Sequence, residues 1–227
     1  MFQSSAFGCC LETRNFLCHV RIFPGLRKPR LRKSFMLSGR SLSPVSMQPW
    51  GAAASLVGVA MFVVTVVALH VLQPDYKPAH QLMSELALGR YGWAMVVAFT
   101  GLAIGVFGVQ AAIGMLGASR GFRFLMLAAA LFFLAAGVFP LGDTSEIHIG
   151  AISTAFVLSV VSMYLFPASA GRAAAAAPRA VSWSLAAGVA ASVALGHSVL
   201  PMGIGQRLAA SCLLVWLVIL GWRLWRQ

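Results

Sequence analysis

Acidic residues are scarce in this sequence. Its 227 residues include 5 Asp or Glu against 17 Lys or Arg, so the formal net charge is +12. Charged residues of both signs make up only 10% of the chain, whereas 59% of the residues are hydrophobic and the mean hydropathy is +0.85. A chain with so few polar residues cannot cover the surface of a water-soluble globule. We therefore expect an integral membrane protein.

Cysteine chemistry and the common catalytic motifs are also missing. Three of the four cysteines, Cys9, Cys10 and Cys18, lie near the start and Cys212 lies in a hydrophobic run, so neither a disulfide framework nor a CxxC metal spacing is present. The chain contains no HExxH, GxSxG or Walker motif. Its basic residues lie at the ends of apolar segments and in one N-terminal block, so we expect no nucleic-acid partner.

The first 46 residues differ in composition from the rest. They contain eight Lys or Arg and a single acidic residue, Glu12. Such a stretch fits a targeting segment, a basic tail that contacts anionic lipid, or an extension from a start codon assigned too early. We favour the last, because Met36 and Met47 precede the first apolar segment. We expect residues 1–46 to be disordered and residues 47–227 to form the transmembrane domain.

Six windows from Trp50 onward are long and apolar enough to cross a bilayer, which takes about 20 residues per helix. In the second, Gly101, Gly105 and Gly108 have the spacing that is typical of closely packed helices. The fold class is therefore an all-α, six-helix transmembrane bundle. The windows are about 52–73, 92–116, 124–141, 148–167, 182–200 and 207–224.

Basic residues follow the even-numbered windows, whereas the opposite connections carry most of the acids. By the positive-inside rule, the connections rich in arginine face the cytoplasm. We therefore expect both termini to be cytoplasmic in a multi-pass protein of the cell (inner or plasma) membrane. The arginines are Arg120, Arg123, Arg172, Arg179, Arg223 and Arg226.

Most ionisable residues other than arginine fall on the outer side of this topology. Such groups at membrane depth are costly and usually have a partner or a function. Two simpler interpretations remain open: Asp143 and Glu146 match a helix capping box, and residues 80–88 match a short amphipathic helix in the interface. The outer residues are His70, Asp75, His80, Glu85, Asp143, Glu146, His148 and His197.

Three stretches resemble a bacterial membrane family known as domain of unknown function 998. They are MSELALGRYGWAM (83–95), GVFPLGDTSEIHIGAISTAF (137–156) and GIGQRLAASCLLVWLVILGW (203–222). The resemblance implies six helices and membrane residence, but no established activity. The positions that match the family pattern are Ser84, Glu85, Asp143, His148 and Arg207.

Two functional hypotheses follow, besides a scaffold subunit. In the first, the protein is a membrane-embedded hydrolase of a lipid-like substrate in which Ser84, Asp143 and His148 are catalytic and a divalent metal could activate water. In the second, the same groups relay protons or bind a small solute in a carrier or sensor. The further candidate binding residues are Glu85, Arg207, Glu146, His80 and His197.

Charge complementarity predicts how these residues meet. Arg207, at the start of the sixth window, would pair with Asp143 or Glu85 and hold the second outer hairpin against the first outer loop. His148 would then lie beside a carboxylate. We expect the five family-type positions to converge in one outer-facing pocket.

Overall fold

The computed structural model describes residues 48–196 and 198–227. Over these residues the chain forms six α-helices and two 3₁₀ helices and has no strand, which confirms the all-helical expectation. The expectations for residues 1–46 and for His197 lie outside the described residues. The helices are α1 (Gln48–Leu72), η1 (Met83–Leu88), α2 (Ala94–Gly114), α3 (Arg120–Val138), α4 (Ser145–Ser169), η2 (Gly171–Ala176), α5 (Arg179–Gly196) and α6 (Met202–Trp225).

All six α-helices are long and apolar enough to cross a membrane. Five of them begin three to five residues before the predicted windows, because a first turn at the headgroup level can carry polar side chains that an apolar window excludes. Helix α3, for example, begins at Arg120, where the Ser119 hydroxyl accepts the Phe122 N–H at 3.3 Å. The chain is a multi-pass membrane protein.

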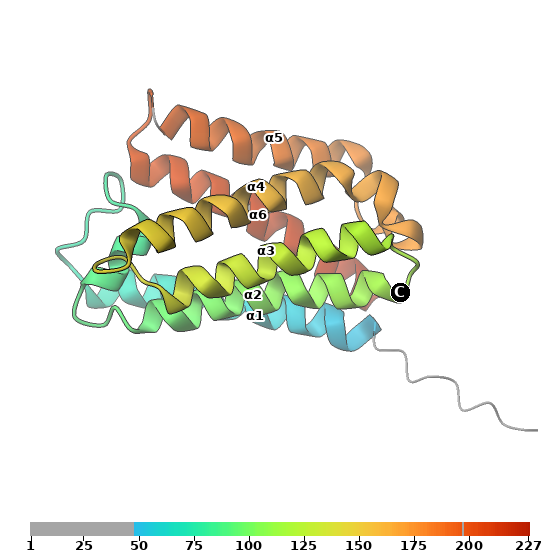
Figure 1. Ribbon diagram of the computed structural model, residues 1–227, viewed down its shortest axis with the longest axis horizontal. Helices are drawn as coiled ribbons and strands as arrows, with labels where there is room; N and C mark the ends of the chain where they lie inside the picture. Colours follow the sequence, from blue (N-terminus) through green and yellow to red (C-terminus); the bar gives the residue numbers. More distant parts are fainter. Residues whose placement is uncertain (1–47, 197) are drawn as a thin grey trace, which may run out of the picture. The chain divides into compact units, whose positions relative to one another are not determined.

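The helices alternate in direction, so their connections collect at two ends of the bundle (Figure 1). We call the end formed by residues 73–93, 139–144 and 198–201 the hairpin end. We call the end where α1 begins and α6 ends the terminal end. Each helix packs on the next and α1 also packs on α6, which closes the bundle.

Glycines bring the backbones of α1 and α2 together. A Cβ atom on Gly58 would lie 2.4 Å from the carbonyl oxygen of Gly101, and one on Gly108 would lie 2.6 Å from that of Gly51. Any larger residue would push the helices apart, which is the close packing predicted from the small-residue spacing. This contact makes the α1–α2 pair a rigid base for the rest of the bundle.

The terminal half of the bundle is filled by aromatic side chains. Phe166 and Trp216 are at most 1% exposed, and their rings meet edge to face with centroids 5.6 Å apart. The Trp216 indole N–H donates to the Ser182 hydroxyl of α5 at 3.2 Å. These contacts join α4, α5 and α6 in this half of the bundle.

Candidate functional site

The α3–α4 hairpin turns its acidic side chains outward. Asp143 and Glu146 are both exposed. Helix α4 begins after Thr144, which makes no side-chain cap bond, so the predicted capping box is wrong. The turn is closed instead by the hydroxyls of Thr144 and Ser145, each of which donates to a turn carbonyl at 2.7 Å.

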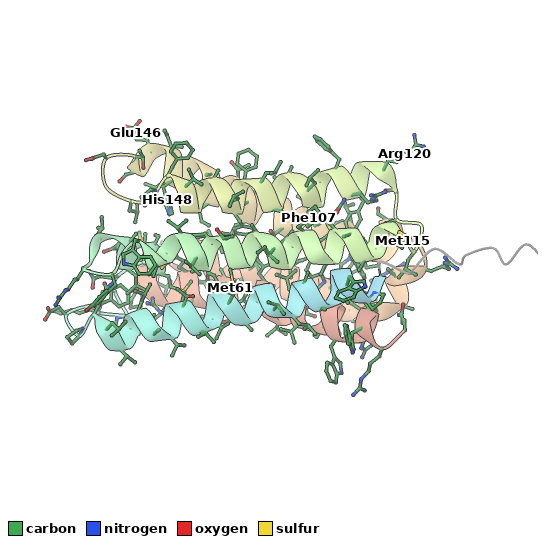
Figure 2. All side chains as sticks on the ribbon, turned by 90° about the horizontal axis from the view of Figure 1, so that it is seen from below. Met61, Phe107, Met115, Arg120, Glu146 and His148 are labelled. Atoms are coloured by element: carbon green, nitrogen blue, oxygen red, sulfur yellow. The ribbon has the colours of Figure 1, made fainter. Side chains whose placement is uncertain are left out.

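His148, one turn further along α4, faces into the bundle, whereas Glu146 points away from it (Figure 2). His148 is 1% exposed, and its Nδ1 atom lies 2.8 Å from the Ala136 oxygen and 3.0 Å from the Phe139 oxygen. A helix leaves its last carbonyls without intrahelical partners. Because both neighbours are acceptors, Nδ1 carries the hydrogen and donates to them. His148 therefore caps the end of α3.

The second ring nitrogen of His148 has no such partner. Its Nε2 atom is buried and makes no hydrogen bond to any of the described residues. In a neutral imidazole with its hydrogen on Nδ1, Nε2 is an acceptor. Leaving a buried acceptor unsatisfied costs about 1–3 kcal/mol. The carboxylate neighbour expected from the sequence is replaced by backbone carbonyls and by the Phe99 ring, whose centroid is 5.5 Å away.

His148 lines an open chamber of about 580 Å³ between α4, α5 and α6. Ser84 and Gln206 line its wall near the hairpin end, and Val157 and Val189 line it nearer the middle of the membrane. The 13-residue step from His148 to Val161 corresponds to about 20 Å along α4. The chamber is therefore most polar at one end and mostly apolar along its depth, where Ser153 and Ser192 lie among the valines.

The chamber opens on the side of the bundle. Ile149 and Val157 of α4 line it and are 54% and 61% exposed, and Val193 of α5 lines it and is 43% exposed. These residues belong to membrane-spanning helices, so their exposed surfaces face lipid. An amphiphile in the bilayer can reach the chamber without passing through water.

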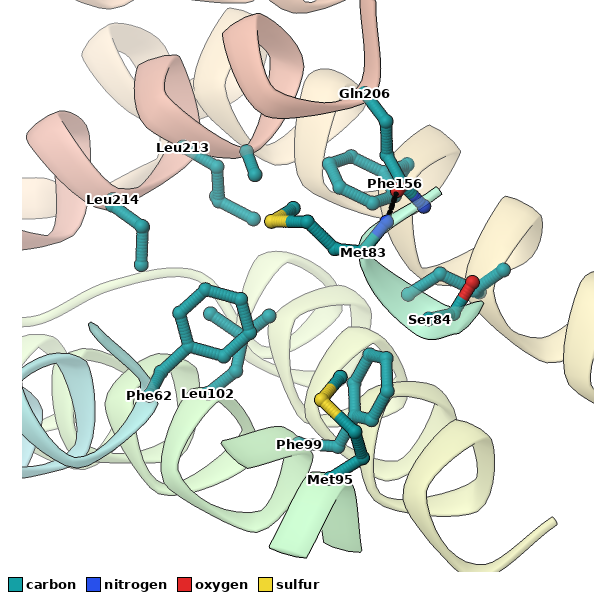
Figure 3. Close-up of a pocket in the computed structure, with 12 residues that line it drawn as sticks. Phe62, Met83, Ser84, Met95, Phe99, Leu102, Phe156, Gln206, Leu213 and Leu214 are labelled. Atoms are coloured by element: carbon teal, nitrogen blue, oxygen red, sulfur yellow. Dashed lines mark hydrogen bonds between the residues drawn. The ribbon is translucent and has the colours of Figure 1, made fainter. Parts of the chain in front are cut away.

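A second, much smaller cavity lies beneath η1 in the core, with a volume of about 20 Å³ (Figure 3). It shares Ser84, Ile152, Phe156 and Gln206 with the chamber. The Gln206 side-chain oxygen accepts the backbone N–H of Met83, a bond that ties η1 to α6. The cavity is large enough for one water molecule, so the core beside the chamber is nearly filled, and residues of η1, α4 and α6 lie between the two.

Arg207 joins α6 to the first outer loop, residues 73–93, which we call the cap loop. Its Nη1 atom donates to the carbonyls of Gln81 and Gly203 at 3.1 and 2.8 Å. Its Nη2 atom donates to the Tyr76 hydroxyl and to Nε2 of His70, the latter at 3.1 Å. Since the guanidinium has only donors, the His70 Nε2 must accept, and the His70 Nδ1 donates to the Val66 carbonyl at 2.6 Å.

We call Arg207, together with the four residues that accept its hydrogen bonds, the Arg207 clamp; the four are His70, Tyr76, Gln81 and Gly203. Its acceptors are two carbonyls, a hydroxyl and an imidazole, so the predicted pairing of Arg207 with Asp143 or Glu85 is not found among the described residues. Glu85 instead accepts the backbone N–H of Leu82 at 2.8 Å and caps η1.

The pKa of Tyr76 in the clamp differs from the ordinary value for tyrosine. Burial raises the pKa of its phenol, and the Arg207 hydrogen bond and charge oppose that rise in part. The hydroxyl therefore keeps its hydrogen at neutral pH and donates it toward the carbonyls of Gln81 and Leu82, at 3.1 and 2.8 Å. The clamp holds the cap loop through uncharged acceptors around a single cation.

The family comparison covers both of these features. Residues 56–223 match the family described as "Protein of unknown function (DUF998)". The chain belongs to the DUF998 family. No match was found among curated proteins or among solved structures. The DUF998 region begins within α1 and ends near the end of α6, so it contains the chamber and the Arg207 clamp.

In this DUF998 protein, the site residues predicted from the sequence lie in three places. Ser84 and His148 line the chamber together. Arg207 and Glu85 belong to the neighbouring clamp and cap loop. The exposed group comprises His80, on the surface of the cap loop, and Asp143 and Glu146 of the α3–α4 hairpin.

Two site residues were missed from the sequence, Gln206 and Tyr76. Both are polar residues beside a residue that was noticed: Gln206 directly precedes Arg207 and the sixth apolar window, and Tyr76 follows Asp75 in the outer loop. A polar amide within a membrane helix is the signal that could have identified Gln206. Tyr76 was interpreted only as an interfacial aromatic.

The DUF998 chain offers no ready metal centre in its described part. No group of three or more His, Cys, Asp or Glu side chains there is close enough together to hold a metal ion. His197, one of the candidate ligands, lies outside the described residues. The chemistry of the described site therefore rests on one imidazole, one amide and hydroxyl groups.

Proposed function

We propose that this protein binds a lipid-like molecule in the chamber between α4, α5 and α6. The polar end of the ligand lies at Ser84, His148 and Gln206, and its apolar part follows the valines of α4 and α5. The observation that carries this proposal is His148, a buried residue that lines the chamber and whose Nε2 atom has no hydrogen-bond partner among the described residues. A buried polar group of this kind in a membrane protein usually serves a ligand or a partner.

Filling the chamber tests the proposal. Ala190 lines the chamber on α5, whereas Ala187, one turn away on the same helix, is exposed and does not line it. Native mass spectrometry of purified protein should find a retained lipid in the wild type and in Ala187→Phe, and should find it lost in Ala190→Phe. Equal lipid content in the two variants would refute the proposal.

The proposal places the chamber in the outer leaflet of the plasma membrane, with both termini in the cytoplasm. The basis is the concentration of arginines at the terminal end, such as Arg120 and Arg179. In a variant without the native cysteines, Asp143→Cys should react with an impermeant thiol reagent from outside the cell and Ala175→Cys should not. The opposite labelling would invert the orientation and leave the chamber itself unchanged.

Hydrolysis of the bound molecule is a second candidate function, favoured by the same ring nitrogen. As an acceptor, Nε2 of His148 can take a proton from water, so that hydroxide attacks an ester or amide carbonyl and the leaving alcohol or amine then receives the proton. The Ser84 hydroxyl lines the same chamber and makes no hydrogen bond to any other described residue, so it can donate to the developing oxyanion. This version requires neither Asp143 nor a metal.

Replacing the base separates hydrolysis from binding alone. The variant His148→Gln keeps a side-chain donor for the α3 carbonyls but removes the basic nitrogen. With lipids that carry a fluorogenic ester or amide, it should lose turnover while lipid retention by native mass spectrometry persists. If the wild type releases no product, or if His148→Gln releases as much as the wild type, His148-dependent hydrolysis is refuted and binding stands.

A further inference from the structure

The donor and acceptor roles of the two His148 ring nitrogens determine which polar group of a ligand can bind at this end of the chamber. The two carbonyls of α3 fix the hydrogen of His148 on Nδ1, which leaves Nε2 as an acceptor without a donor. A ligand that satisfies it must bring an O–H or N–H group. An ester or ether oxygen, which can only accept, does not satisfy Nε2.

Two other polar side chains at this end complement a hydroxyl group. The Ser84 hydroxyl can both donate and accept, and it makes no hydrogen bond to any other described residue. Gln206 uses its side-chain oxygen for the Met83 N–H, which leaves its amide N–H groups as donors. A hydroxyl group on the ligand can therefore donate to Nε2 of His148 and accept from Ser84 or Gln206.

The chamber wall contains no Lys, Arg, Asp or Glu among the described residues. Arg207 follows Gln206 directly in the sequence, but its guanidinium is committed to the clamp, with acceptors on the cap loop, on α1 and in its own first turn. An anion placed in an apolar site without a counter-charge is strongly disfavoured. The wall therefore selects against phosphate and carboxylate groups.

The size of the chamber limits how much of a lipid it encloses. A volume of about 580 Å³ falls within the range of about 300–1,000 Å³ for small-molecule sites. The lateral opening between the exposed residues Ile149, Val157 and Val193 lets hydrocarbon chains continue into the bilayer. The enclosed part is the polar group with the beginning of its chains.

We infer that the ligand is an uncharged lipid with a free hydroxyl group, of the diacylglycerol type, and that the chamber discriminates against phospholipids. This inference rests on the proposed lipid-binding function and names its ligand class. The free hydroxyl is the recognised feature, and the absence of charge is the condition for entry.

Three probes with identical acyl chains test this. The full-length protein in phosphatidylcholine nanodiscs is photolabelled with a diazirine-tagged diacylglycerol, with its 3-O-methyl ether, or with the corresponding phosphatidic acid. The ether lacks only the donor, and loss of one hydrogen bond is expected to reduce labelling of chamber peptides about five- to tenfold. Phosphatidic acid should label the chamber at least about tenfold less than diacylglycerol.

Two variants assign the preference to residues. Ser84→Ala removes a hydroxyl without breaking an internal bond of the described structure, and it should weaken labelling by diacylglycerol and by its ether alike, because both carry an oxygen that can accept from Ser84, so their ratio should not change. His148→Phe should bring that ratio to about one. If His148→Phe does not fold, competition by the unlabelled lipids on the wild type still measures the preference.

The outcomes separate the inference from the proposed function. Labelling of the wild type that is no stronger than that of Ala190→Phe, for all three probes, would refute lipid binding itself. Chamber labelling that is equal for diacylglycerol and its ether, or stronger for phosphatidic acid, would overturn the inference while lipid binding stands. Cross-links from chamber residues to a second copy of the chain would overturn both.

Discussion

The contact between α1 and α2 gives a sharp test of the fold, because a single methyl group is expected to separate them. In Gly58→Ala the new Cβ would lie 2.4 Å from the Gly101 oxygen and 2.5 Å from the Gly105 nitrogen. Cβ atoms essentially never approach other atoms within 3.0 Å. The helices must therefore part by about 0.6 Å, the difference between this limit and the 2.4 Å to the Gly101 oxygen. Both neighbours are backbone atoms, so no side-chain rotation can relieve the clash.

The expected cost is about 1–3 kcal/mol, the usual range for overpacking in a well-packed core. Gly150→Ala is the matched control, since its new Cβ would have no described atom within 4 Å outside its own stretch of helix, and it occupies an exposed position in α4. By helix propensity alone, that change should stabilise the protein by up to about 1 kcal/mol. The two substitutions are therefore expected to change the free energy of unfolding in opposite directions.

Unfolding in mixed micelles with increasing dodecyl sulfate, followed by tryptophan fluorescence, measures both free energies. Gly58→Ala should unfold at a lower dodecyl sulfate fraction than the wild type, and Gly150→Ala at an equal or higher one. If Gly58→Ala is as stable as the wild type, the close α1–α2 contact is wrong. If both variants lose the same stability, the effect is not one of interhelical contact.

Three further predictions concern polar groups. Arg207→Lys keeps the charge but loses the guanidinium's planar set of donors. Hydrogen exchange should therefore show that the free energy of opening the cap loop falls by about 1.5–3 kcal/mol. Because the pKa of Tyr76 is raised in the folded state, its contribution to stability is fully present below the ordinary tyrosine pKa of about 10 and is lost as pH rises through the higher folded value. Unfolding measured between about pH 9 and 12 should therefore show a smaller alkaline loss in Tyr76→Phe than in the wild type. Ser55→Ala removes a buried hydroxyl with no partner among the described residues, so its effect on the free energy of unfolding should be neutral or stabilising. Ser182→Ala leaves the buried Trp216 N–H without its acceptor and should lower the free energy of unfolding by about 1–3 kcal/mol in the same assay.

Hydropathy and small-residue spacing were sufficient for the helical framework, because both are local properties. The six spans and the close approach at Gly101 follow from the apolar windows and the glycine pattern. The glycine of the α3–α4 turn also has a local explanation, since Gly142 adopts φ +124°, a conformation that favours glycine.

The partners of Arg207 could not be predicted in this way. Counting charges matched it with a carboxylate, but a guanidinium is satisfied equally well by carbonyls, and a folded loop supplies these without any sequence signal. Two of its acceptors, on His70 and Tyr76, lie more than 130 residues away in the sequence. The chamber was likewise unpredictable, because it results from how far two helices stand apart.

The chamber lies between α4 and α5 because that seam is fixed at only one end in the described structure. Near the terminal end, the Trp183 indole N–H of α5 donates to the Tyr164 carbonyl of α4 at 3.0 Å, and the two rings stack with centroids 5.4 Å apart. Toward the hairpin end, α5 instead turns to α6, where a Cβ on Gly205 would lie 2.7 Å from the Gly196 Cα.

At the same end, α4 is held on α3 by the bonds from His148 to the α3 carbonyls. At the hairpin end α4 therefore packs on α3 and α5 packs on α6, which leaves the space between α4 and α5 open toward that end. Ser84, His148 and Gln206 line the chamber at the hairpin end, and the valines of α4 and α5 line it deeper in the membrane. A lipid that enters from the side can therefore keep its polar group near the membrane surface while its chains remain in hydrocarbon.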